Sequence, residues 1–192
     1  LLLRWTMPVY TLDDLITECS SGRSRIDLPA RKKRAVYADA WESLNRWVDS
    51  QFEKGQGVNI ANFCKITWET VARSLSGDER RRPYFALHDS FCRANGLPVR
   101  VKGSGAHPDE SLAKCTDINF SVLAIKYSAS LTKDQAFSAM RDIIQKLGQV
   151  FGSGRKVVID MHVGRLVARE RKVTLLFDVK LERFVDRARG AE

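Results

Sequence analysis

Two runs of basic side chains stand out in this sequence as groups that could bind another molecule. They are the first basic run, Arg31, Lys32, Lys33 and Arg34, and the second basic run, Arg80, Arg81 and Arg82. Clustered guanidinium and ammonium groups attract acidic partners, and the net charge of +9 has the same sign. Three explanations are compatible with this pattern: binding to nucleic acid, binding to the acidic surface of a microtubule, or a basic tract that is only solvated and binds nothing.

Side chains that could act as nucleophiles, acids, bases or metal ligands are few and scattered. The 192 residues include four cysteines, with no CxxC pair among them, and three histidines far apart in the chain. We place Asp13 and Asp14 as charges in the first turn of a helix, and His162 as a packed or solvent-facing residue beside a hairpin turn. No motif of a nucleotide-binding enzyme, zinc protease or serine hydrolase is present. The sequence therefore predicts a non-catalytic protein with no cofactor, metal or small-molecule substrate.

The cysteines and the hydropathy of the chain indicate a location in the cytoplasm. Cys64 and Cys92 lie within apolar patterns, where a free thiol behaves as a small hydrophobic group, and this favours a reducing compartment. No apolar run reaches the roughly 20 residues that are needed to cross a bilayer. We therefore expect no membrane span.

The apolar pattern of the first half predicts the elements that carry the two basic runs. Residues 11–18 form a short helix capped by Thr11, and residues 20–34, with Pro29 and the first basic run, form a linker. Apolar residues then recur every three or four positions from Val36 to Phe52, as on one buried helix face. The remaining elements are a hairpin, a polar stretch, a short strand and a short helix, at 58–68, 74–82, 83–87 and 89–95.

The second half shows the same order of elements after a linker that is rich in glycine and proline. Residues 118–127 are apolar and β-branched enough to be extended, and Thr132 caps a helix that continues to Phe151. Gly152 and Gly154 end this helix. The elements that follow are three strands and a closing helix, at 157–161, 166–169, 172–177 and 179–187.

A shift of 99 residues superimposes the two halves without a gap. Helix positions, the glycine stop and the next strand fall in register: Ala40/Ala139, Trp41/Met140, Leu44/Ile143, Val48/Leu147, Phe52/Phe151, Gly55/Gly154, Val58/Val157 and Ile60/Ile159. Any two amphipathic helices can be slid into agreement, but the glycine stop and the strand pattern extend the match beyond the helix. The sequence therefore predicts a duplicated unit, with each copy a fold in its own right.

This order of elements resembles the HU/IHF fold. The resemblance is carried by residues 54–63 (KGQGVNIANF) and 154–166 (GRKVVIDMHVGRL), which are similar to the HU-type strand and turn, and by Arg82 to Phe85. In the first half Asn62-Phe63-Cys64 replaces the glycine turn, so we expect a turn of different construction there. Over 157–177 the second half is similar to the second HU module of the eukaryotic family of tandem-HU, coiled-coil-domain-containing proteins of centrosomes and cilia.

The resemblance implies an α+β fold of two tandem HU/IHF-like units. Each unit would hold a helix, a three-stranded antiparallel sheet and a short closing helix. The expected organisation is an N-terminal short helix with a basic linker, a first unit, a linker and a second unit, at 1–33, 34–97, 98–114 and 115–192. HU subunits dimerise through their helical faces, so the two units could pack as an intramolecular pseudo-dimer. The candidate inter-unit residues are Trp41, Leu44, Trp47, Val48, Phe52, Met140, Ile143, Ile144, Leu147 and Phe151.

The function that the resemblance implies is structural. We expect a scaffolding module of a cilium, flagellum or centrosome assembly, attached to axonemal microtubules, with tubulin or other axonemal proteins as partners of the basic runs. The alternative is an HU-like, non-specific DNA-binding protein. In HU a long basic arm between the second and third strands enters the minor groove. At those places this chain has only residues 74–82 and Glu170-Arg171, so we expect neither unit to carry an arm that wraps DNA.

Overall fold

Two copies of one helix–helix–sheet arrangement make up the computed structural model, which describes residues 8–73, 75–77, 79–99, 110–178 and 181. The first unit contains α1 (Leu12–Ser21), α2 (Ala30–Glu53), β1 (Gly57–Ile60), β2 (Cys64–Arg73), β3 (Glu79–Leu87) and α3 (Asp89–Ala94). The rest of the described chain contains β4 (Cys115–Asp117), α4 (Phe120–Val122), the π-helix η1 (Leu123–Tyr127), α5 (Lys133–Gly152), β5 (Val157–Met161), β6 (Gly164–Arg169) and β7 (Lys172–Phe177). The closing helix predicted at 179–187 lies outside the described residues apart from Leu181.

The two predicted helix caps are confirmed. Thr11 precedes α1 and forms a capping box with Asp14, while Thr132 and Gln135 do the same at the start of α5. Both long helices bury most of the predicted apolar stripe, although Phe137 of α5 is 41% exposed. No helix in the described part of the chain combines the length and the apolarity that a bilayer span requires.

The linker predicted over 20–34 is shorter than expected, because α2 begins at Ala30. The first basic run therefore forms the opening turns of α2, and it is not part of a linker. Arginine and lysine are good helix formers, and proline is well tolerated at the start of a helix, where Pro29 lies. An apolar periodicity cannot mark this turn, since the turn has no apolar face toward the core.

The extended segment predicted at 118–127 is wrong for most of its length. Residues 120–127 are helical, as α4 and η1, and only the three residues of β4 before them form a strand. Asn119 caps this helix, with its Oδ1 accepting a hydrogen bond from the backbone N–H of Val122 at 3.1 Å. An apolar run of this length is compatible with the period of a helix and with that of a strand. The cap at Asn119 is the signal that decides for the helix.

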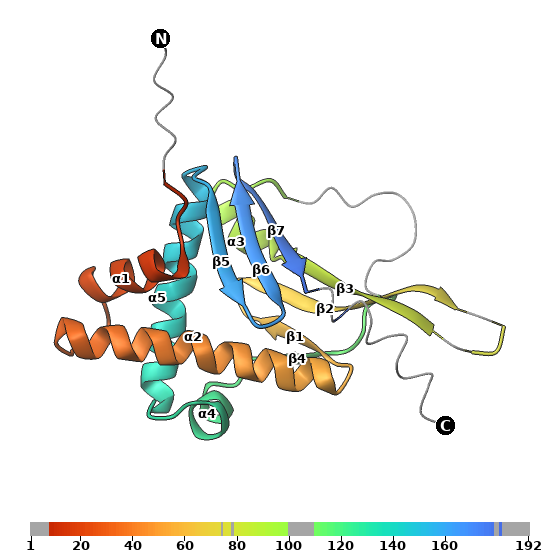
Figure 1. The fold of residues 1–192 in the computed structure, drawn as a ribbon, viewed down its shortest axis with the longest axis horizontal. Helices are drawn as coiled ribbons and strands as arrows, with labels where there is room; N and C mark the ends of the chain where they lie inside the picture. The colour runs from red at the N-terminus through yellow and green to blue at the C-terminus, as the bar shows by residue number, and fades with distance from the viewer. Residues whose placement is uncertain (1–7, 74, 78, 100–109, 179–180, 182–192) are drawn as a thin grey trace, which may run out of the picture.

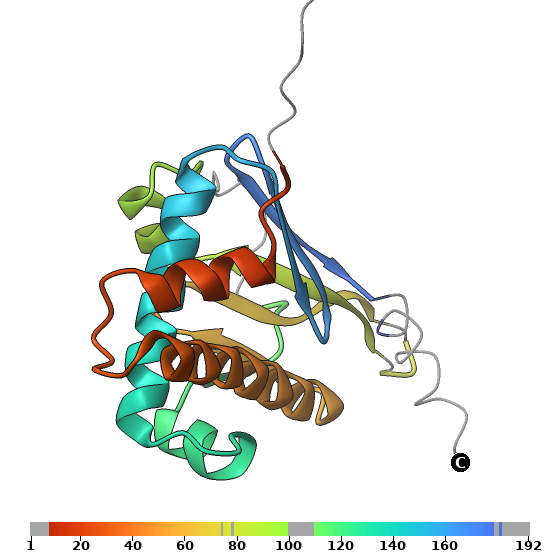
Figure 2. The same ribbon diagram turned by 60° about the vertical axis from the view of Figure 1, so that its left-hand side comes forward.

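The two sheets have the orders β3-β2-β1-β4 and β5-β6-β7. The hairpin β1–β2 turns at Asn62, which takes a φ of 59°. This turn is built differently from the β5–β6 turn, which leads into Gly164 with a φ of 154°. The hairpin β6–β7 turns on Glu170-Arg171, as predicted. The helices gather on one side of the molecule and the sheets on the other, with one hydrophobic core between them (Figure 2).

The C-terminal end of the predicted 98–114 linker is attached to the sheet of the first unit, whereas residues 100–109 lie outside the described residues. The backbone N–H of Ala113 donates to Trp68 O at 2.8 Å, and that of Thr70 donates to Ser111 O at 2.8 Å. The chain then crosses to the far edge of β1, where β4 pairs in parallel. The first sheet therefore has a fourth strand in addition to the predicted three.

Candidate interaction surfaces

The first basic run lies at the N-terminal end of α2, where three of its four cations remain available. Arg34 forms an ion pair with Asp13 of α1 and donates to Thr17 Oγ1 at 2.6 Å. Arg31 and Lys32 are exposed and Lys33 is half-buried, and none of the three has an ion-pair partner among the described residues. The opening turn of α2 contains no acidic side chain. Because the N-terminus of a helix already carries partial positive charge, this end of the molecule attracts anions.

The second basic run lies on β3, and most of its charge is neutralised within the hairpin. Arg81 Nη2 is 2.9 Å from Glu79 Oε2, and Arg82 Nε is 2.8 Å from Glu69 Oε2. Arg80 is exposed and has no ion-pair partner in the described part of the chain. The two basic runs lie at opposite ends of the molecule, so they do not form one continuous surface (Figure 1).

Residues 79–82, predicted to belong to a polar stretch, form the first part of β3, so the first unit has a short projecting hairpin, which we call the arm. Strands β2 and β3 continue their pairing beyond the sheet to Arg73 and Glu79, and the hairpin projects from the body of the molecule (Figure 1). At its tip Leu75 is fully exposed, and Val71 on β2 is 44% exposed. The polar composition of residues 79–82 gave no sign of a strand. These residues are extended because they pair with the end of β2 on the other side of the hairpin. In the second unit the β6–β7 turn is tight, as expected.

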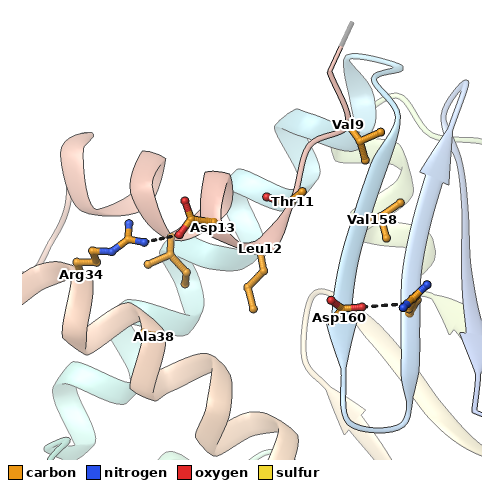
Figure 3. Close-up of a pocket in the computed structure, with 10 residues that line it drawn as sticks. Val9, Thr11, Leu12, Asp13, Arg34, Ala38, Val158 and Asp160 are labelled. Atoms are coloured by element: carbon orange, nitrogen blue, oxygen red, sulfur yellow. Dashed lines mark hydrogen bonds and ion pairs between the residues drawn. The ribbon is translucent and has the colours of Figure 1, made fainter. Parts of the chain in front are cut away.

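A groove of about 760 Å³ lies between α1, α2 and the outer edge of β5 (Figure 3). Its apolar lining includes Leu12, Ile16, Ala38 and Val158. The Asp13–Arg34 ion pair flanks it on the helix side and the Asp160–Arg165 pair, with Nε and Oδ1 3.1 Å apart, on the strand side (Figure 3). Both cations are already held by carboxylates. The groove therefore offers apolar contact and lacks a set of nucleophile, base and orienting group.

The ten residues that we named as candidates for inter-unit packing all belong to the single core. Ile144 is partly buried and the other nine are buried. Helices α2 and α5 contact each other directly. Polar bonds reinforce this contact: Tyr37 Oη donates to Asp142 Oδ2 at 2.6 Å, and the indole N–H of Trp41 donates to the carbonyl of Asp160 at 3.3 Å.

His162 takes part in a contact that the sequence did not reveal. The residue lies in the β5–β6 turn of the second unit and reaches α2 of the first, where its Nδ1 is 2.6 Å from Asp49 Oδ2 and its Nε2 is 3.2 Å from Glu42 Oε2. Partial burial alone would lower the pKa of His162, but the hydrogen bonds and charges of Asp49 and Glu42 outweigh burial and raise this pKa above its ordinary value. Glu42 and Asp49 lie seven positions apart on one helix face. This spacing alone does not predict a histidine contact, because the sequence does not show which segment packs against that face.

The cysteines are free thiols, and three of the four are buried. Burial is the largest cause that raises the pKa of the Cys19 thiol to about 12, and it also raises the pKa of Cys64. Among the described residues no group of three or more His, Cys, Asp or Glu side chains is arranged to hold a metal ion.

Two family models match the chain one after the other. The model described as CCDC81 eukaryotic HU domain 1 matches residues 18–98, and the model described as CCDC81 eukaryotic HU domain 2 matches residues 114–189. Among curated proteins, none matches the chain. The first match starts within α1 and ends after α3, and the second starts just before β4.

Proposed function

Because the chain belongs to the CCDC81 eukaryotic HU domain family, with domains 1 and 2 in tandem, we propose that it is a non-catalytic scaffolding module. The observation that carries this proposal is the shared core: α2 and α5, one from each unit, pack together, and each unit completes the other. We infer that the two HU units cover each other's helical faces as an intramolecular pseudo-dimer. Such a body needs no second chain to bury those faces, and its outer surfaces are left for docking.

The assembly that this module serves is, in our proposal, that of a cilium, flagellum or centrosome, at the cytoplasmic cytoskeleton. The partner surface is acidic, as on tubulin or another axonemal protein of similar charge. Support for this comes from Arg31, Lys32 and Lys33, whose cations have no ion-pair partner among the described residues. Charge attraction of this kind steers association and weakens as the ionic strength rises.

Co-sedimentation with microtubules tests this partner. The triple variant R31E/K32E/K33E should lose pelleting, whereas Arg34 is left intact because it holds α1 through Asp13. A matched control reverses three exposed cations on the β6–β7 hairpin of the second unit, in the variant R169E/R171E/K172E. Loss of pelleting with the first variant alone supports the proposal. Equal loss with both variants, or no loss with either, removes the N-terminal end of α2 as the tubulin contact.

Non-specific DNA binding is the second candidate, and the β2–β3 arm is the observation that favours it. The arm presents two exposed side chains, the apolar Leu75 at its tip and Arg80 on β3, which are the kinds of group that minor-groove binding uses. Against this reading, Arg81 and Arg82 are already paired with Glu79 and Glu69, so the arm has little charge left to follow phosphates.

A gel-shift series with duplex DNA from low to physiological salt separates the two candidates. Binding by charge alone falls steeply with salt. Tight binding that survives physiological salt and is abolished by both L75S and R80E would favour the DNA function over the scaffold. The scaffold proposal expects weak binding that is lost at physiological salt and is insensitive to Leu75.

A further inference from the structure

The β5–β6 turn of the second unit is fastened to α2 of the first unit through a single residue. The backbone N–H of His162 donates to Asn45 Oδ1 at 3.0 Å, and the two nitrogens of its ring face Asp49 and Glu42 at 2.6 and 3.2 Å. One residue thus makes three polar contacts along one face of α2. The imidazole is 38% exposed, so solvent protons reach it.

Both ring nitrogens face carboxylates, and this arrangement depends on the protonation state. A carboxylate accepts hydrogen bonds and cannot donate them. Only the imidazolium form donates from both of its nitrogens, whereas neutral histidine presents a lone pair on one of them. When His162 loses its proton, one of the two contacts therefore becomes an approach of two acceptors. The protonation state of the ring decides whether the turn is held at two points or at one.

We propose that His162 is a proton-controlled latch that closes the β5–β6 turn of the second unit onto α2 of the first. The latch is closed when the imidazole is protonated, and it loosens as the pH rises. This inference concerns the junction between the two units, and it does not depend on the partner that the module binds.

In the part of the chain that the structure describes, few charged groups lie around the latch. From α2, Asp49 and Glu42 face the ring, and Arg46 Nε lies 3.2 Å from Glu42 Oε1, so Glu42 is shared between two cations. On the latch's own hairpin, Asp160 is paired with Arg165. Among the described residues, the charges that act on His162 are those of Asp49 and Glu42, and both favour the protonated ring.

The direction of the pH effect follows from these two carboxylates. They raise the pKa of His162 in the folded chain above its value in the unfolded chain. The stabilisation of the turn is therefore complete below the unfolded pKa, and it is lost as the pH rises through the folded pKa. On either side of His162, Met161 and Val163 are buried, so the turn stays anchored in the core when the latch opens. Opening is then a local event and not an unfolding of the unit.

Two reporters in the intact chain test the latch by nuclear magnetic resonance between pH 5.5 and 8.5. The first is the titration of the imidazole of His162. The second is the exchange protection of the indole N–H of Trp41, which donates to Asp160 O on the same hairpin. We expect protection to fall as the pH passes the midpoint of His162, by up to about tenfold for each pH unit that separates the folded and unfolded pKa values.

Variants of the two acceptors make the test specific. D49N and E42Q should each move the midpoint of His162 to lower pH, and H162Q should remove the pH dependence of Trp41 protection. His88 is the internal control: burial and Lys65 lower its pKa, and its midpoint should not respond to D49N. Trp41 protection that is independent of pH in the unmodified chain, or a His162 midpoint that D49N and E42Q leave unchanged, overturns the proposal.

Discussion

Asn95, the residue that follows α3 of the first unit, fills the space that a side chain at Gly148 of α5 would need. A Cβ on Gly148 would lie 2.4 Å from Asn95 Oδ1, and one on Gly152, a turn later, 2.5 Å from Asn95 O. The amide of Asn95 is held by its own helix, since Nδ2 donates to Phe91 O at 2.9 Å. The closing helix of one unit thus docks on a glycine step of the other unit's long helix, beside the Phe91–Phe151 ring contact.

This docking predicts an unusual response to glycine replacement. In an exposed helix Gly→Ala stabilises by about 1 kcal/mol, but we expect Gly148→Ala to lower the free energy of unfolding by about 1–3 kcal/mol because of overpacking. Urea denaturation measures the change. Asn95→Ala should relieve the effect of Gly148→Ala and should not relieve that of Gly152→Ala, where the clash is with backbone. Additive losses for Asn95 and Gly148 would contradict this contact.

The bond between Tyr37 and Asp142 should be a measurable part of the inter-unit contact. Burial and this hydrogen bond raise the pKa of Tyr37, so the phenol stays protonated and donates. Tyr37→Phe removes the shorter of the two hydrogen bonds to Asp142 Oδ2 and leaves only the one from Ser24 Oγ at 3.4 Å. We therefore expect a loss of about 1.5–3 kcal/mol in the free energy of unfolding. In a double-mutant cycle by urea denaturation, Asp142→Asn should cost less in the Tyr37→Phe background than in the unmodified chain. Equal costs would show that the two side chains are not coupled.

Two substitutions in the β6–β7 turn should stabilise the folded chain. Glu170 and Arg171 take φ values of 50° and 64°, the left-handed conformation at both positions of a two-residue hairpin. Asparagine followed by glycine adopts this conformation with less strain. The double substitution Glu170→Asn with Arg171→Gly should therefore raise the free energy of unfolding by about 0.5–2 kcal/mol in thermal or urea denaturation.

Gly164 provides the opposite case on the same sheet. Its φ is 154°, and a Cβ there would lie 2.1 Å from Leu176 O. Gly164→Ala should therefore destabilise the chain by about 1–3 kcal/mol. A neutral result at Gly164, or a loss of stability with the Asn-Gly turn, would mean that the backbone of this hairpin differs from the one described.

Thiol reactivity should separate the four cysteines. Cys115 is half-buried, whereas Cys19, Cys64 and Cys92 are at most 5% exposed. The thiolate is the reactive species, and the raised pKa of Cys19, about 12, keeps its thiolate scarce. With N-ethylmaleimide near neutral pH, we expect mass spectrometry to find Cys115 modified first, and the other three only after denaturation. Labelling of Cys19 as fast as Cys115 would contradict the burial of α1 against α5.

Most elements could be predicted because their signals are local. The stripe from Val36 to Phe52, the glycine stops and the turn at Glu170-Arg171 each depend on neighbours within a few positions. The predictions that failed concern segments whose structure depends on distant parts of the chain or whose local signal is ambiguous. The start of α2 at Ala30 has no apolar face to mark it, and β4 becomes a strand only because β1 presents a free edge to it. At 120–127 a short apolar run fits both periods, and Asn119 was the overlooked cap.

The sequence by itself determined that the chain holds two copies of one α/β unit, because a duplicated pattern of helix, glycine stop and strand is visible residue by residue. It also determined the family. Only the tertiary structure decided how the copies meet: Asn95 on Gly148, Tyr37 on Asp142, and His162 between Glu42 and Asp49. These pairs are separated by 53 or more positions in the sequence. Their side chains meet only in the tertiary structure, and no local periodicity encodes such distant contacts.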